Sequence, residues 1–241
     1  MKQVGTDFPT WDGTIPHARE LQGMLAGRVV LRDGFAKPLR TVAGLVAAPE
    51  EDGAGTCAAA VLIDAETLEV LDEQVAHVKN TTPYVPGFLS FLALPALLRV
   101  LAMLPRPPDL ALVDGHGIAH PQRFGIAAHF GVVTDLPTIG IAPRPLLGTA
   151  ASLHQVRGAY TPLREHGQQI GWLLRSKPQA APIVVSPGHR VAMASAADLC
   201  MRFTRDERVP EPVHVAQRHA LRRGNVDDAG EAEAEGPDAG E

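Results

Sequence analysis

The stretch DLALVDGHG, residues 109–117, decides the fold. Its four consecutive apolar residues, Leu110 to Val113, are typical of a central strand buried on both faces of a parallel sheet. The run ends in Asp114, and a glycine stands on either side of His116. A carboxylate at the end of a buried strand, beside a loop of small residues, indicates half of a metal site, because hard divalent cations prefer oxygen ligands.

Hydrophobic periodicity predicts the elements on both sides of this stretch. Upstream we expect a helix, three strands in an antiparallel meander, and a buried helix, at residues 17–31, 40–48, 57–64, 68–79 and 90–104. Downstream we expect a helix, three strands and a last helix, at residues 121–133, 136–142, 168–175, 181–188 and 190–203.

This element order predicts an α/β fold with a ribonuclease H-like mixed β-sheet flanked by helices. In that architecture, carboxylates on the first and fourth strands hold metal ions between them. Asp114 ends the predicted fourth strand, so the partner carboxylate should lie on the first strand.

Composition is that of an ordinary globular protein. Of the 241 residues, 45% are hydrophobic, and no run of 18 apolar residues predicts a membrane span. The first 20 residues include Asp7, Asp12 and two prolines, which a signal peptide would not, so we expect a cytoplasmic protein. Cys57 and Cys200 lie too far apart in sequence for a metal-ligand pair, and we expect two buried free thiols.

The C-terminal tail carries much of the negative charge. Residues 224–241 contain seven acids and no base, and we expect this tail to be disordered and solubilising, or to compete with phosphate for basic patches. Without its seven acids the chain has 22 basic and 20 acidic residues, a balance that permits nucleic-acid binding. We expect an N-terminal segment and helix at residues 1–33, one domain at 34–220 and the tail at 221–241.

Four motifs resemble those of the endonuclease V family, the deoxyinosine 3′ endonucleases. They are TTPYVPGFLSF (81–91), LVDGHGIAHPQRFGIAAHFGVVTDLPTIGIA (112–142), RSK (175–177) and SPGHRV (186–191). The resemblance extends from about residue 40 to about residue 212. It implies a protein that binds inosine in DNA or RNA and cuts the second phosphodiester bond 3′ to it, leaving a 3′-hydroxyl and a 5′-phosphate. The implied cofactor is Mg²⁺ or Mn²⁺.

The resemblance also implies a set of catalytic residues, and this chain keeps only part of it. Asp114 matches a metal-binding acid, and His189 matches the histidine that orders a metal-bound water. The other three positions hold Val46 for a first-strand Asp, Ala93 for a helix Glu and Pro143 for a phosphate-binding Lys. The nearest cation to that last position is Arg144.

These replacements predict weak or absent metal binding and impaired cleavage. A lone carboxylate can hold Mg²⁺ weakly with the help of substrate phosphate, but it cannot form a two-metal site. Loop carboxylates would have to replace the missing ligands, and the candidates are Glu50, Glu51, Asp52 and Asp135.

The residues that would recognise the substrate are better preserved. The resemblance implies a wedge that separates the strands and a pocket for the flipped base, although a Pro-Tyr-x-Pro-Gly sequence on its own also suits a rigid turn. The wedge residues are Pro83, Tyr84 and Pro86, and the pocket residues are Gly87, Gly115 and His116.

The remaining candidates have structural alternatives. We expect His120 and His129 to be hydrogen-bonded core residues, because the histidine spacings fit no zinc site. Arg175 and Lys177 suit either surface positions or phosphate contacts, and His189 also suits a helix start.

Three hypotheses follow. The chain binds inosine-containing or distorted nucleic acid without efficient cleavage; or it is an active Mg²⁺- or Mn²⁺-dependent deoxyinosine 3′ endonuclease of DNA repair with a rearranged metal site; or it is a remodelled, non-nuclease scaffold. An apolar wall beside Asp114 favours the first, and a second carboxylate near Asp114 favours the second.

Overall fold

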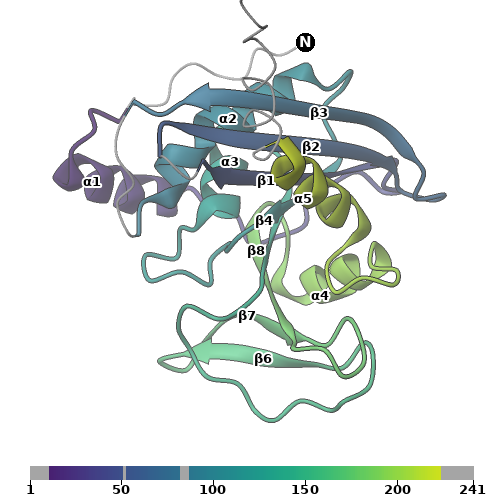
Figure 1. Cartoon of the computed structure of the whole chain (residues 1–241). Helices are drawn as coiled ribbons and strands as arrows, with labels where there is room; N and C mark the ends of the chain where they lie inside the picture. The colour runs from purple at the N-terminus through teal and green to yellow at the C-terminus, as the bar shows by residue number, and fades with distance from the viewer. Residues whose placement is uncertain (1–10, 51–52, 82–86, 224–241) are drawn as a thin grey trace, which may run out of the picture.

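One eight-stranded mixed sheet organises the chain (Figure 1). The computed structural model describes residues 11–50, 53–81 and 87–223. In spatial order the strands are β3-β2-β1-β4-β5-β8-β7-β6. Their bounds are Thr41–Pro49 (β1), Gly55–Asp64 (β2), Val70–Lys79 (β3), Leu110–Asp114 (β4), Thr138–Ala142 (β5), Tyr160–Glu165 (β6), Gln168–Leu174 (β7) and Ile183–His189 (β8).

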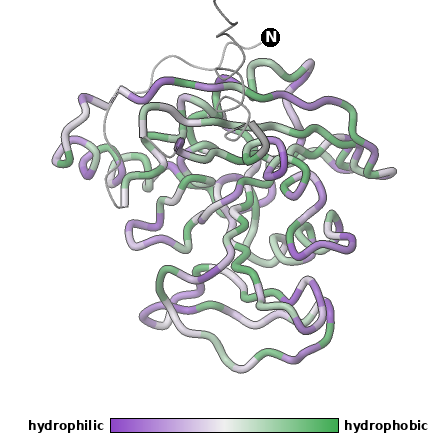
Figure 2. The backbone as a smooth tube through the Cα atoms, in the orientation of Figure 1, coloured by the Kyte–Doolittle hydropathy of each residue, from purple (hydrophilic) through white to green (hydrophobic). Residues whose placement is uncertain are grey.

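The predicted fold class is confirmed. Strand β4 pairs in parallel with β1 and β5, while β1, β2 and β3 form the expected antiparallel meander. Strands β5, β8, β7 and β6 continue the sheet in antiparallel pairs. In Figure 2 the hydrophobic stretches follow the inner strands, and the hydrophilic stretches lie in the outer loops.

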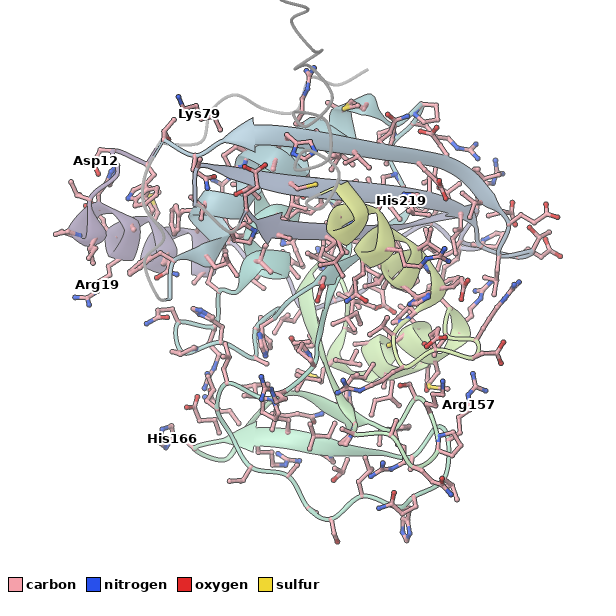
Figure 3. The ribbon with its side chains drawn as sticks, in the orientation of Figure 1. Asp12, Arg19, Lys79, Arg157, His166 and His219 are labelled. Carbon is pink, nitrogen blue, oxygen red and sulfur yellow. The ribbon has the colours of Figure 1, made fainter. Side chains whose placement is uncertain are left out.

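Helices cover both faces of the sheet. They are α1 (Ile15–Ala26), α2 (Leu89–Met103), α3 (Ile126–Thr134), α4 (Met193–Arg202) and α5 (Glu211–Arg223). Helices α2 and α3 share one hydrophobic core with Leu45 and Val113. Helices α4 and α5 share another core with Val46 and Leu112, from the opposite face of the same two strands. On α5, His219 lies within 3.0 Å of Glu73 on β3 (Figure 3).

Several predicted boundaries are wrong. Helix α1 ends at Ala26 rather than at residue 31, since Gly27 forms its C-cap. Helix α3 begins at Ile126 rather than at residue 121, because Arg123 has a positive φ of 53° and Gly125 is extended. Strand β6 and helix α5 were not predicted, and α5 continues past residue 220, where we expected the domain to end.

Two expectations from composition can be compared with the structure. Cys57 and Cys200 are free and buried, as expected. Within the ranges that the structure describes, no helix is long and apolar enough to cross a membrane.

The N-terminal end of α5 packs directly on the backbone of β1. A Cβ atom added at Gly44 would overlap the main chain of Pro212 and Val213 at the start of that helix. Val213, Ala216 and Ala220 form the buried stripe of α5, at helical spacing. Gly44 therefore sets how closely α5 approaches the sheet.

We predict that Gly44→Ala destabilises the protein. Overpacking of a dense core costs about 1–3 kcal/mol, and here the obstacle is main chain that cannot rotate away. Urea unfolding followed by circular dichroism measures the change. The control is Gly23→Ala on the exposed side of α1, where an added Cβ meets nothing within 4 Å. That change should stabilise the helix by about 0.5–1 kcal/mol. Equal effects of the two changes would contradict the close packing at Gly44.

Candidate functional site

Asp114 ends β4 between two apolar side chains. The parallel register pairs Leu45 of β1 with Val113, which brings Val46 beside Asp114 on the face that α5 covers. On the other side, Ile141 of β5 pairs with Asp114. The position where the resemblance expects a second carboxylate is thus next to Asp114, and it holds a valine that is only 5% exposed.

The side-chain partner of Asp114 is an amide. Gln217 of α5 donates a hydrogen bond from Nε2 to Asp114 Oδ2 at 2.9 Å. Burial raises the pKa of the Asp114 carboxyl above its usual 3.8, and the hydrogen bond from Gln217 opposes that shift. Sequence analysis did not identify Gln217 as a site residue.

A cavity of about 290 Å³ opens beside this pair. Its walls come from the end of β4, the end of β5, the α4–α5 connection and α5. The lining residues are Asp114, Ile141, Pro143, Glu207, Arg208, Val209, His214 and Gln217.

Arg208 brings positive charge to the cavity. Its Nη2 donates to the carbonyls of Pro143 at 2.7 Å and Pro182 at 2.9 Å, and its Nε donates to that of Ala181 at 2.7 Å. The cation expected near Pro143 was Arg144, but the guanidinium in the cavity belongs to Arg208. A sequence signal for this region existed: Pro210-Glu211-Pro212 is typical of a helix start, and it would place His214 and Gln217 one turn apart.

The residues at the site do not fit a family-type metal centre. Across residues 11–50, 53–81 and 87–223, no group of three His, Cys, Asp or Glu side chains is arranged to hold a metal ion. Ala93 of α2 is fully buried in the core on the other face of the sheet, with Leu45 and Val113. The strand neighbours of Asp114 are apolar, and Glu207, the other carboxylate that lines the cavity, lies 3.8 Å from Lys177. The oxygen ligands that Mg²⁺ or Mn²⁺ requires are therefore not gathered around Asp114.

The loop carboxylates do not supply the missing ligands. Glu50 follows the C-terminal end of β1, four residues past Val46, and contacts His77 Nδ1 at 3.0 Å. Asp135 forms the C-cap of α3, and its carboxylate lies 2.5 Å from the Arg190 guanidinium. It lies near the start of β5, whereas Asp114 pairs with Ile141 near the end of that strand. The candidates Glu51 and Asp52 lie outside the described residues.

His189 does not lie with Asp114. It pairs with Thr138 at the start of β5, whereas Asp114 pairs with Ile141 near its end. His189 Nδ1 accepts a hydrogen bond from the Val30 amide at 3.3 Å, and Nε2 lies 3.3 Å from Asp135. Burial lowers the pKa of His189. The expectation that it orders a water at Asp114 conflicts with this position; here it ties the N-terminal segment to β8.

The loop after β4 is held rigidly. Gly115 has a φ of +131°, and His116 Nε2 lies 3.0 Å from the Arg144 carbonyl. Gly117 donates to Ser186 Oγ at 2.8 Å, and its carbonyl accepts from Gly125 at 2.9 Å. A side chain at Gly117 would overlap the Pro187 carbonyl, so the loop depends on glycine there. The predicted pocket residues Gly115 and His116 are therefore preorganised.

Part of the predicted recognition element can be placed. Pro83, Tyr84 and Pro86 lie outside the described residues. Gly87, directly after them, has a φ of +86°, and its carbonyl accepts a hydrogen bond from Gln22 Nε2 at 3.1 Å. Helix α1 thereby fixes the start of the segment that leads into α2.

Two histidines have the expected structural roles. His129 is buried between Phe91 and Phe124, and its Nδ1 lies 3.1 Å from Ser90 Oγ. Burial lowers its pKa to about 3, so the ring is neutral at pH 7. His120 accepts a hydrogen bond from the Gln122 amide, and burial lowers its pKa to about 4.

Arg175 and Lys177, the two candidate phosphate contacts, differ. The Arg175 side chain is buried and donates to the carbonyls of His154 and Ala180, which argues against phosphate contact. Lys177 is exposed and lies 3.8 Å from Glu207. Only Lys177 has its charge at the surface.

The comparisons with known proteins agree on one family. Residues 23–218 match the family model for Endonuclease V. Endonuclease V of Xanthomonas campestris pv. campestris strain 8004 is 54% identical, over 91% of this chain and 93% of its own. Endonuclease V of Azotobacter vinelandii is 54% identical, over 90% of this chain and 97% of its own. The Streptomyces avermitilis endonuclease V structure superposes with a TM-score of 0.84 at 36% identity, covering 94% of this chain and 97% of that one.

We predict that His129 makes stability depend on pH. Its pKa is about 3 in the folded chain against an ordinary 6.5, so between these values the unfolded chain binds a proton that the folded chain does not. The free energy of unfolding must then fall as pH falls below 6.5, by up to about 1.4 kcal/mol per pH unit. His129→Gln should flatten this slope between pH 6.5 and 5 in urea titrations.

His166 provides the control. It is exposed in the turn between β6 and β7 (Figure 3), and His166→Gln should leave the slope unchanged. Parallel slopes for the wild type and His129→Gln would show that the buried ring takes up its proton normally.

Proposed function

Because the chain belongs to the endonuclease V family, we propose that it binds inosine-containing nucleic acid and cleaves it weakly or not at all. One observation carries the proposal. Asp114 lies between Val46 and Ile141, and a neutral amide, not a second carboxylate, faces it. This is the apolar wall that separates a nucleic-acid reader from a working metal-dependent nuclease.

The proposed binding of inosine-containing nucleic acid is supported by the loop after β4 and by the sequence of residues 83–87. Gly87, Gly115 and His116 are the proposed pocket residues for a flipped base, and the hydrogen bonds of His116 and Gly117 hold the loop after β4 in place. Tyr84 and its prolines match the family wedge, and base stacking on an aromatic ring contributes about 1–3 kcal/mol per base. The endonuclease V of Ciona intestinalis, whose structure shares this fold at 19% identity and a TM-score of 0.77, was solved with DNA containing an inosine.

The proposed loss of cleavage is supported by the absence of charged side chains at the three positions that the resemblance matches to catalytic residues. In this family the metal would activate water and neutralise the scissile phosphate. Removing a single preorganised group of that kind typically costs about 10²–10³ in rate. The substitutions at Val46, Ala93 and Pro143 remove two acids and a cation together, and such losses are not additive.

An active enzyme is the second candidate. The naming of relatives at 54% identity as Endonuclease V favours it. It requires Asp114 to recruit Mg²⁺ or Mn²⁺ with substrate oxygens alone. A non-nuclease scaffold is the third candidate, and it requires that inosine-containing duplexes are not bound.

We predict binding without efficient cleavage. Gel shifts of labelled inosine-containing DNA and RNA duplexes should show complexes that weaken with salt, as phosphate contacts require. Cleavage in Mn²⁺ or Mg²⁺ should not exceed that of Asp114→Ala. Cleavage that Asp114→Ala abolishes would establish the active enzyme, and the absence of any complex would leave the scaffold.

We also predict that Val46→Asp, Ala93→Glu and Pro143→Lys together raise cleavage of the same duplexes. The three changes restore the charges that the resemblance assigns to these positions, and circular dichroism checks the fold because Val46 and Ala93 are buried. The matched control adds Asp114→Ala to the triple variant and should return cleavage to background. A folded triple variant with no more activity than this control would contradict the assignment of these three positions.

A further inference from the structure

We infer that the Gln217 side chain takes the position of a cation at Asp114, so that this pocket is closed to divalent metals. The inference rests on the geometry of the described residues and not on the proposed function. No role for Gln217 follows from the sequence motifs.

The position of Gln217 is fixed by the packing of α5. Val213, Ala216 and Ala220 of this helix are buried in the core that also contains Val46 and Ile141. Gly44 sets the distance of the helix from β1. Helix α5 thus holds the Gln217 amide 2.9 Å from Asp114 Oδ2.

The chemistry of the contact opposes metal binding. The Nε2 group of Gln217 is a hydrogen-bond donor with no lone pair for a cation, and it occupies Oδ2, one of the two oxygens that Asp114 could offer to a metal. To act as a ligand, the amide must turn and present Oε1 instead. Metal binding at Asp114 would therefore have to replace the hydrogen bond from Gln217.

The charged residues that line the cavity also disfavour a metal cation. The Arg208 guanidinium lines the cavity and is held by three carbonyls, including that of Pro143. A fixed positive charge in the wall of this cavity disfavours the binding of a metal cation there. Glu207 also lines the cavity, but it lies 3.8 Å from Lys177, which compensates its charge.

The pair has a consequence for substrate binding, and this step alone depends on the proposed function. If the Gln217 amide takes the place of a metal ion at Asp114, binding of inosine-containing duplexes needs no divalent cation. The affinity should be the same in EDTA and in Mg²⁺ once ionic strength is matched.

The experiment is a Mn²⁺ titration of the full chain without nucleic acid, followed by electron paramagnetic resonance of the free ion. The variants are Asp114→Asn, Gln217→Glu and Gln168→Glu, the last an exposed control on β7. Residues 224–241 contribute the same acidic background to all of them. We expect the wild type to match Asp114→Asn, and Gln217→Glu to gain one saturable site that Gln168→Glu lacks.

The gain should be large. Losing even an outer-shell partner costs about 10–100-fold in metal affinity, so a new carboxylate ligand should tighten binding by about tenfold or more. Mn²⁺ should also raise the Tm of Gln217→Glu and not that of the wild type. Gln217→Asp serves as a second variant if Gln217→Glu folds poorly, as judged by circular dichroism.

Two results would overturn the inference. One is a Mn²⁺ site in the wild type that Asp114→Asn abolishes, because the pocket would then be open to a divalent metal. The other is a folded Gln217→Glu and a folded Gln217→Asp that both bind no more Mn²⁺ than the wild type. Failure of duplex binding would count against the proposed function and leave this titration unaffected.

Discussion

The contact between α5 and Gly44 is the constraint on which the site depends. Because glycine lets the helix reach the backbone of β1, Gln217 meets Asp114 and the buried stripe of α5 fills the core beside Val46. A larger residue at Gly44 would lift the helix and leave the carboxylate without its donor. The packing of the core and the chemistry of the pocket therefore have one origin.

The changes around Asp114 are mutually consistent in physical terms. A buried carboxylate without a metal or a donor costs several kcal/mol or shifts its pKa upward. Val46 and Ala93, which the resemblance matches to two family carboxylates, are buried, and Asp114 receives a hydrogen bond from Gln217. Arg208 brings a guanidinium to Pro143, where the family has a lysine. Within the described part of the chain, no group of three His, Cys, Asp or Glu side chains is arranged here to hold a metal.

Much of this could be predicted from the sequence, because long apolar runs and motifs carry strong signals. The meander, the buried helix α2 and the parallel strand β4 follow from periodicity, and the resemblance identified Asp114, Val46 and Ala93. Helix α5 escaped prediction because only a narrow stripe of it is apolar, and Gln217 and Arg208 were missed with it. The match of His189 by motif conflicts with its position, because sequence alone does not say that β8 runs antiparallel to β5, which places His189 at the opposite end of β5 from Asp114.

The central claim is that Asp114 binds Gln217 and not a metal. The most direct measurement is anomalous diffraction from crystals of the wild-type chain grown with an inosine-containing duplex and Mn²⁺. We expect no anomalous peak within coordinating distance of Asp114, and Gln217 Nε2 still hydrogen-bonded to its carboxylate. A Mn²⁺ peak coordinated by Asp114, with the Gln217 side chain displaced or turned, would contradict the claim.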